Sequence, residues 1–143
     1  MGFTCNSNSP QETEALGKTI AATLKGGEII ALYGGMGMGK TAFTRGVAEG
    51  LGISGGVSSP TFALVHEYAG GRLPLYHFDM YRVTSWDDLY STGFFDYLDT
   101  DAVLVIEWSE NIDGALPEKK ISIVVERGEG EEQRVFHVEG VDI

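Results

Sequence analysis

An apolar run, a glycine-rich turn and a helical stretch follow one another in residues 28–50, and this succession constrains the fold more than any other feature. Residues 28–33 have the composition of a buried parallel strand. Residues 34–39 include four glycines, and a helical pattern then runs from Lys40 to about Gly50. A strand that enters a helix through such a turn is the unit from which parallel α/β sheets are built.

The turn also matches a motif with a chemical meaning. Residues 34–41 read GGMGMGKT, which fits the pattern G-x-x-x-x-G-K-[ST] of a phosphate-binding P-loop. Backbone N–H groups of such a loop converge on phosphate oxygens, and the positive end of the following helix faces the same anion. The predicted phosphate contacts are Gly35, Met36, Gly37, Met38 and Gly39. Lys40 is expected to reach the β- and γ-phosphates, and Thr41 to ligate Mg²⁺. The alternative is a glycine-rich turn with a solvated lysine.

The rest of the chain alternates helices with apolar strands. Residues 9–12 have the composition of a helix start, with a serine cap, a proline at the first position and a glutamate in capping-box register. Gly26 and Gly27 are expected to end that helix. Further strand-like runs are residues 62–68, 73–80, 102–106, 121–126 and 134–138, and short helical pieces are residues 86–90 and 94–98. The pattern predicts one α/β domain over residues 1–143, a three-layer P-loop NTPase-like fold with a central, mostly parallel sheet and an antiparallel flank.

The charge balance disfavours several classes of protein. The chain has 21 acidic and 10 basic residues, a formal net charge of −11. Proteins that hold nucleic acid or anionic membranes usually present a basic face, so we expect neither activity from this chain alone. One cysteine, Cys5, allows no internal disulfide and no cysteine-rich zinc site. No signal-like start and no apolar run of about 18 residues is present, which favours a cytoplasmic protein.

Two acidic residues follow predicted strands and are candidates for the chemistry of a P-loop site. Glu107 comes directly after the apolar residues 102–106, where P-loop proteins place a second acid at the metal. Its alternative is an acid that ends a strand at the solvent boundary. Asp79 lies at the end of another strand-like run, where it could orient the attacking water or hold the metal through a water molecule. Its alternative is an ion pair with Arg82.

Other residues are weaker candidates for contacts with a nucleotide. Thr61 follows a proline in a loop and could approach the γ-phosphate, although an ordinary turn explains it nearly as well. Trp108 could stack near the nucleotide, but burial in the core is favoured. Arg134 could approach the nucleotide from the tail, or simply be solvated. His66 and His77 are interpreted as structural or partner-facing, because they have no metal-ligand partners at useful spacing.

Four motifs in order resemble those of the TsaE (YjeE) family, small bacterial P-loop ATPases of tRNA threonylcarbamoyl-adenosine modification. They are the P-loop, the Ser59-Pro60-Thr61-Phe62 loop, the segment from His77 to Arg82, and Ile106-Glu107-Trp108. The similarity extends over about residues 12–125. It implies that ATP and Mg²⁺ are the cofactors, that Lys40 and Asp79 serve hydrolysis, and that Thr41 and Glu107 hold the metal. A segment around Thr13 also resembles one that lies near the nucleotide in the family.

The resemblance further implies a place in a larger assembly. The partners TsaD and TsaB would transfer the threonylcarbamoyl group to adenosine 37 of tRNAs that read ANN codons. This chain would bind that complex and reset it through ATP hydrolysis, reaching tRNA only indirectly, and its hydrolysis alone would be weak until a partner completes the site. Two alternatives stay open: an ATP-dependent binding switch in which hydrolysis is incidental, and a small-molecule kinase.

Overall fold

The computed structural model describes most of the chain. The described residues are 2–34, 40–53, 65–68, 70–80, 83–98, 100–130 and 133–141, with the side chain of Asp113 excepted. The predicted phosphate contacts at 35–39, the loop residue Thr61 and the first three residues of the predicted strand 62–68 lie outside these ranges.

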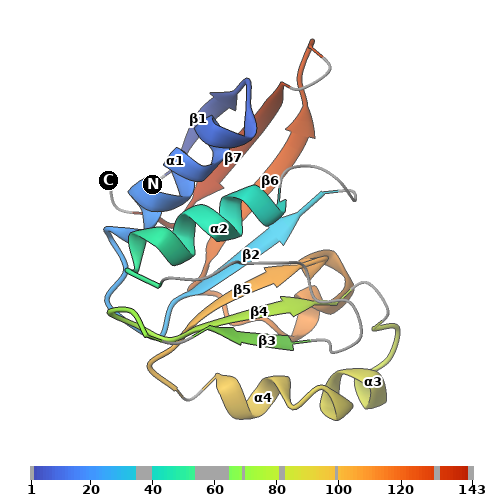
Figure 1. Cartoon of the computed structure of the whole chain (residues 1–143). Coiled ribbons are helices and arrows are strands. Elements are labelled where there is room, and N and C mark those ends of the chain that lie inside the picture. The colour runs from blue at the N-terminus through green and yellow to red at the C-terminus, as the bar shows by residue number, and fades with distance from the viewer. Residues whose placement is uncertain are drawn as a thin grey trace.

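The described residues form a seven-stranded mixed sheet in the order β1-β7-β6-β2-β5-β4-β3 (Figure 1). Its strands are β1 (Gly2–Ser7), β2 (Ile29–Tyr33), β3 (Val65–Tyr68), β4 (Leu75–Asp79), β5 (Val103–Glu107), β6 (Ile121–Arg127) and β7 (Arg134–Glu139). The four central strands, β6, β2, β5 and β4, pair in parallel with one another. The outer pairings β1–β7, β6–β7 and β3–β4 are antiparallel. The predicted α/β fold with a parallel centre and an antiparallel flank is confirmed.

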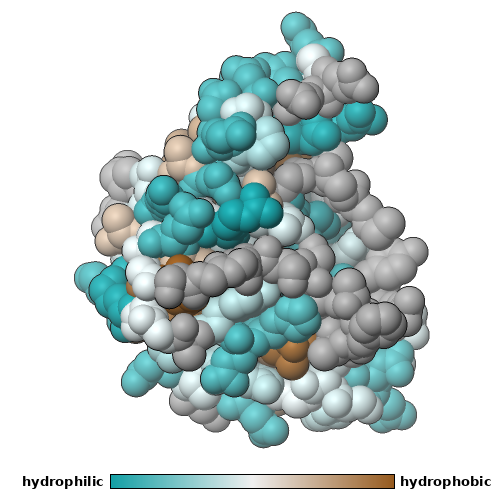
Figure 2. Space-filling model, viewed as in Figure 1, coloured by the Kyte–Doolittle hydropathy of each residue, from teal (hydrophilic) through white to brown (hydrophobic). Residues whose placement is uncertain are grey.

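Helices cover both faces of this sheet. Two of them, α1 (Pro10–Ala21) and α2 (Lys40–Gly50), pack on one face, and their own outer surface is mostly hydrophilic (Figure 2). The other face is covered by α3 (Trp86–Ser91), α4 (Phe94–Tyr97) and the 3₁₀ segment η1 (Ser109–Ala115). Alternate residues of the central strands supply the two cores, since side chains point to opposite faces along a strand. On β5, Val105 packs towards α2, and Leu104 and Ile106 pack towards α4.

The N-terminus of α1 has the predicted cap. The Ser9 hydroxyl accepts a hydrogen bond from the Glu12 backbone N–H at 3.2 Å, and Pro10 occupies the first turn. The Glu12 carboxylate reaches back to the backbone N–H of Asn8 at 3.0 Å. The helix ends at Ala21, earlier than Gly26, because the carbonyls of its last turn accept bonds from Thr23 and Leu24 in a tighter turn.

The sequence pattern did not predict β1 or η1. Strand β1 is at the edge of the sheet and contains the polar residues Thr4, Asn6 and Ser7, so its own composition is a weak signal. It forms because each of its six residues pairs with a residue of β7. A strand that depends on a partner about 130 residues away leaves little trace in its local sequence. None of the described helices is long and apolar enough to cross a bilayer.

Helices α1 and α2 approach closely at two glycines. A Cβ atom on Gly46 would overlap the Glu14 carbonyl oxygen, and one on Gly17 would overlap the Phe43 carbonyl oxygen. In both cases the obstructing atoms belong to backbone, which cannot rotate away. This contact sets the distance between the two helices, and so the position of the first turn of α2.

We therefore expect Gly46→Ala to destabilise the protein, even though alanine favours an isolated helix by about 1 kcal/mol. Overpacking against a backbone typically costs about 1–3 kcal/mol, which urea denaturation monitored by circular dichroism measures directly. Gly114→Ala is the matched control, because nothing lies within 4 Å of its Cβ position. If the Gly46→Ala protein is more stable than the wild type, then the two helices can move apart without a loss of stability, and the expectation is wrong.

Candidate functional site

The candidate site lies where neighbouring parallel strands end. Asp79, the last residue of β4, is paired in register with Glu107, the last residue of β5. Strand β2 lies on the other side of β5 and ends at Tyr33, directly before Gly34. In open α/β sheets, ligands bind outside the carboxyl ends of the strands, so this edge is the expected place for a substrate.

Lys40 begins α2 and is 3% exposed. Its ammonium group donates a hydrogen bond to the Gly34 carbonyl oxygen at 2.8 Å. Burial lowers the pKa of the Lys40 ammonium, while the negative charges of Glu107, Glu110 and Asp79 act in the opposite direction. The lysine is thus fixed at the start of the predicted phosphate loop, where the negative charges of three carboxylates act on it.

Glu107 is buried and is oriented by a histidine. Its Oε2 atom lies 2.7 Å from Nε2 of His77, which is fully buried on β4. Because a carboxylate can only accept, Nε2 carries the hydrogen of this bond. Among the described residues, the other ring nitrogen of His77 has no hydrogen-bond partner. His77 thus has a structural role, as the sequence suggested, and the residue that His77 orients is Glu107, the predicted metal ligand.

A tight turn after β5 places two more residues at the site. Trp108 has a left-handed backbone with φ of 60°, a conformation that costs a residue of its size about 1–2 kcal/mol. The turn brings Glu110 within 3.3 Å of the Gly34 backbone N–H. The Trp108 ring is partly buried against the core, and its centroid lies 4.8 Å from the Lys40 ammonium. Core packing was favoured for this tryptophan, and its ring contacts Lys40 as well.

Thr13 and Arg134 are placed beside Ser7 at the end of β1. Thr13 is 2% exposed, and its hydroxyl lies 2.7 Å from the Ser7 hydroxyl and 3.3 Å from the Ser9 carbonyl oxygen. Arg134 is paired with Ser7 in the sheet and donates to the Gln133 carbonyl oxygen. The hydrogen bonds described for these two residues do not join them to Lys40. Their contact with a nucleotide stays a prediction.

Glu110 and Asn111 contribute to the site although the sequence pattern did not single them out. Asn111 donates to the Met80 carbonyl oxygen at 2.8 Å, and the Met80 N–H donates to the Glu107 carbonyl oxygen at 3.0 Å. These bonds join the two segments that leave β4 and β5. The signal for Glu110 and Asn111 was their position, three and four residues beyond a strand that ends in a candidate acid.

A family model described as "Threonylcarbamoyl adenosine biosynthesis protein TsaE" matches residues 7–136. The chain belongs to the TsaE family. The tRNA threonylcarbamoyladenosine biosynthesis protein TsaE of Bacillus subtilis is 42% identical over 127 residues, which are 89% of this chain and 79% of that protein. The protein of the same name from Treponema pallidum is 40% identical over 119 residues, 83% of this chain and 87% of that one.

The fold comparison agrees with the sequence comparisons. The crystal structure of Bacillus subtilis YdiB superposes on this structure with a TM-score of 0.79 and 34% sequence identity. The match covers 99% of this chain and 87% of that one. The resemblance inferred from the four motifs is therefore confirmed at the level of the family.

The donors at the site suit a hard divalent cation. Thr41 is the second residue of α2, and its hydroxyl and the Glu107 carboxylate, the two predicted metal ligands, are oxygen donors of the kind that Mg²⁺ prefers. In the described part of the chain, no three His, Cys, Asp or Glu side chains gather into a metal-binding group. Mg²⁺ is commonly held by one or two carboxylates together with waters and phosphate oxygens. The residues present fit an ion that arrives with a nucleotide.

The contact between His77 and Glu107 can be measured by a double-mutant cycle. We expect His77→Phe to lower the free energy of unfolding, because it leaves a buried carboxylate oxygen without its donor, at a cost of about 1–3 kcal/mol. The effect should shrink when Glu107 is already Gln, with a coupling energy above about 0.5 kcal/mol. His66→Phe is the control, since His66 is the cross-strand neighbour of His77 but is partly exposed and contacts Tyr68. Additive effects of the two changes would remove His77 from any role in holding Glu107.

Proposed function

We propose that the chain is a P-loop ATPase that takes part in threonylcarbamoylation of adenosine 37 in tRNAs that read ANN codons. The observation that carries the ATPase proposal is the position of Lys40. It begins the helix after the glycine-rich turn, its ammonium contacts Gly34, and the acids Asp79 and Glu107 end the neighbouring strands. Membership of the TsaE family supports the link to tRNA modification.

The charges around Lys40 support ATP with Mg²⁺ as the cofactors. Three carboxylates face one ammonium, an arrangement that would repel the phosphates of a bare nucleotide. A divalent cation held there would supply positive charge that offsets the charge of the phosphates. Thr41 and Glu107 are the residues proposed to hold it, and Lys40 is proposed to exchange its bond to Gly34 for bonds to phosphate oxygens.

Asp79 is proposed to serve the hydrolysis step. It lies beside Glu107 at the carboxyl end of β4, from where it could accept a proton from the attacking water or hold that water in line. His77 holds the Glu107 carboxylate through Nε2 and acts as a positioning residue. Lys40 and Asp79 are thus the proposed catalytic pair, and the two roles are separable by substitution.

The proposed partners are the TsaD and TsaB proteins, in the cytoplasm. A net charge of −11 disfavours direct binding to tRNA, so we propose that the chain contacts tRNA only indirectly, as part of that complex. Hydrolysis by the chain alone is proposed to be weak, because a partner completes the site, and the ATPase cycle is proposed to reset the complex for another turnover.

The first test is steady-state ATP hydrolysis by the purified chain, alone and with the TsaB–TsaD complex encoded in the same genome plus tRNA. We expect strong stimulation by the complex and its loss in Lys40→Ala, which removes the ammonium that contacts the phosphate loop. Titration with a fluorescent ATP analogue should show that Lys40→Ala also abolishes binding. Equal hydrolysis with and without the complex would contradict the proposed link to tRNA modification.

Asp79→Asn separates an ATPase from a nucleotide-dependent switch. If hydrolysis is the working step, this variant should bind ATP with unchanged affinity and lose at least about a hundredfold in turnover, the usual scale for a positioned acid or base. Modification of tRNA in a reconstituted assay should fall with it. Full modification by a variant that no longer hydrolyses ATP would favour the switch, in which binding alone is used. Asp101→Asn, an exposed acid outside the site, is the matched control.

A further inference from the structure

Helices α3 and α4 carry a group of aromatic side chains at the surface. Trp86 is 56% exposed and Tyr90 is 63% exposed. Their ring centroids are 6.5 Å apart, and Phe95 of α4 stacks on Trp86 at 6.5 Å and lies 5.0 Å from Tyr90. We refer to Trp86, Tyr90 and Phe95 as the aromatic patch. Phe95 is partly buried against the core, whereas the two larger rings extend beyond it.

The residue types in this patch are those of a protein–protein interface rather than of ordinary protein surface. Of the three large hydrophobic side chains exposed among the described residues, two belong to it, and the third is Val124 on the opposite flank of the sheet. Tryptophan and tyrosine are enriched among the residues that dominate protein–protein binding, because they bury much area with few rotatable bonds. Scattered exposed apolar residues need no explanation, but rings stacked on each other form one continuous surface.

The chain segment that carries the patch has charges of one sign. Residues 83–118 contain nine acidic residues and no lysine, arginine or histidine. Those exposed on α3 and α4 themselves are Asp87, Asp88 and Asp96. A surface of this kind repels nucleic acid and anionic membranes, and it repels a second copy of itself. It complements a protein surface that offers an apolar contact surrounded by lysine and arginine.

A pocket adjoins the patch. It has a volume of about 260 Å³ and lies between the start of α3 and η1, with Thr84, Trp86 and Leu89 on one side and Ile112 and Ala115 on the other. This is below the range of about 300–1,000 Å³ that small-molecule sites occupy, and it suits a single apolar side chain of a partner. Trp86 belongs both to the patch and to the rim of this pocket, so the two form one surface.

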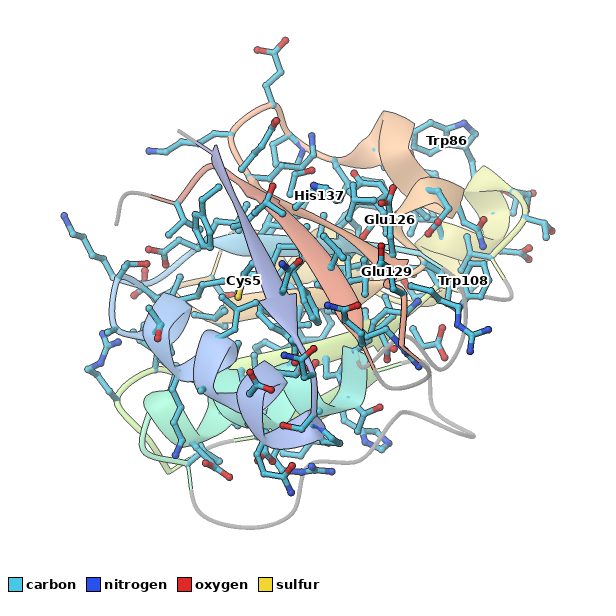
Figure 3. All side chains as sticks on the ribbon, turned by 90° about the horizontal axis from the view of Figure 1, so that it is seen from above. Cys5, Trp86, Trp108, Glu126, Glu129 and His137 are labelled. Atoms are coloured by element: carbon cyan, nitrogen blue, oxygen red, sulfur yellow. The ribbon has the colours of Figure 1, made fainter. Side chains whose placement is uncertain are left out.

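Each wall of the pocket is formed by the chain segment that follows one of the two candidate acids, Asp79 and Glu107. The α3 wall follows β4, which ends at Asp79, and η1 follows Glu107 after a single residue. The side chain of Asn111, on the η1 wall, donates to the Met80 carbonyl oxygen, while the Met80 N–H donates to the Glu107 carbonyl oxygen. Figure 3 shows Trp86 and Trp108 on the same side of the molecule. A group seated in the pocket would therefore press on backbone that is hydrogen-bonded to the ends of both strands.

We propose that the aromatic patch and its pocket form the docking surface for a protein partner that presents an apolar side chain within a basic rim, and that its seating adjusts the acids of the ATPase site. This inference rests on the proposed function, since it explains how a partner could stimulate weak hydrolysis. It adds which face of the chain the partner occupies and which chemistry that partner must present.

The test measures binding of the purified TsaB–TsaD complex to the chain by biolayer interferometry, with a fluorescent ATP analogue as the check on folding. We expect Trp86→Ala and Tyr90→Ala each to weaken binding by about tenfold or more, the scale of an interface hot spot. Both variants should bind the ATP analogue as the wild type does. Val124→Ala is the matched control, because Val124 is an exposed apolar residue on β6, away from the patch.

A charge series tests the basic rim that the proposal assigns to the partner. Asp87→Asn with Asp96→Asn should weaken binding and reduce its dependence on salt, because both carboxylates would face basic groups of the partner. The matched control, Glu129→Gln with Glu139→Gln, also removes two negative charges, but from exposed positions in or near β7. It should change neither the affinity for the complex nor the salt dependence of binding. Asp88 is left intact, since its carboxylate accepts bonds from Thr84 at the start of α3.

The outcomes separate the docking surface from the proposed function. If the wild type binds the complex and the Trp86 and Tyr90 variants bind equally well, the docking proposal is wrong and the proposed function stands. If the wild type does not bind the complex at all, the proposed function fails and the docking proposal fails with it. Sedimentation of the chain alone covers a further case: dimers that Trp86→Ala abolishes would make the patch a contact between copies and overturn the proposal.

Discussion

The parallel pairing of β2, β5 and β4 is the constraint on which the candidate site depends. Because these strands run in one direction, their last residues meet at one edge, and the register of β4 against β5 places Asp79 beside Glu107. Two carboxylates and a buried lysine would not gather in this way through their own attraction, since each loses hydration. The apolar residues of the strands and the backbone hydrogen bonds between them hold the polar groups together.

The contact between α1 and α2 positions another part of the same site, the lysine at the start of α2. Close packing at Gly17 and Gly46 fixes α2 above the sheet, and α2 begins with Lys40, whose ammonium then contacts Gly34. The lysine therefore has its position set by a helix, while the acids have theirs set by the sheet. A small shift between the two layers would change the distance from cation to carboxylates without altering either element.

Much of this arrangement could be predicted from the sequence, and the remainder shows where local patterns fail. The strand–turn–helix unit and the acids Glu107 and Asp79 at strand ends follow from short-range patterns of apolar residues and glycine. The bond between His77 and Glu107 could not be derived, because it depends on which strands are neighbours and in which register. The turn at Trp108 carries no signal either, since nothing in its type favours a left-handed backbone, and β1 depends on pairing with distant β7.

The distribution of charge links the site to the aromatic patch. The acids of residues 83–118 include the exposed Asp87, Asp88 and Asp96 on α3 and α4, and also Glu107 and Glu110 at the candidate site. The face with the exposed rings therefore carries the same sign of charge as the candidate site. A polyanion such as tRNA would be repelled from this face unless a basic protein lay between the two. The same negative charge attracts a partner that covers the face with lysine and arginine. Such a partner would reach the backbone that connects Asp79 with Glu107. In this chain, the acidic surface that disfavours direct contact with tRNA is thus also the surface proposed to bind the protein that controls hydrolysis.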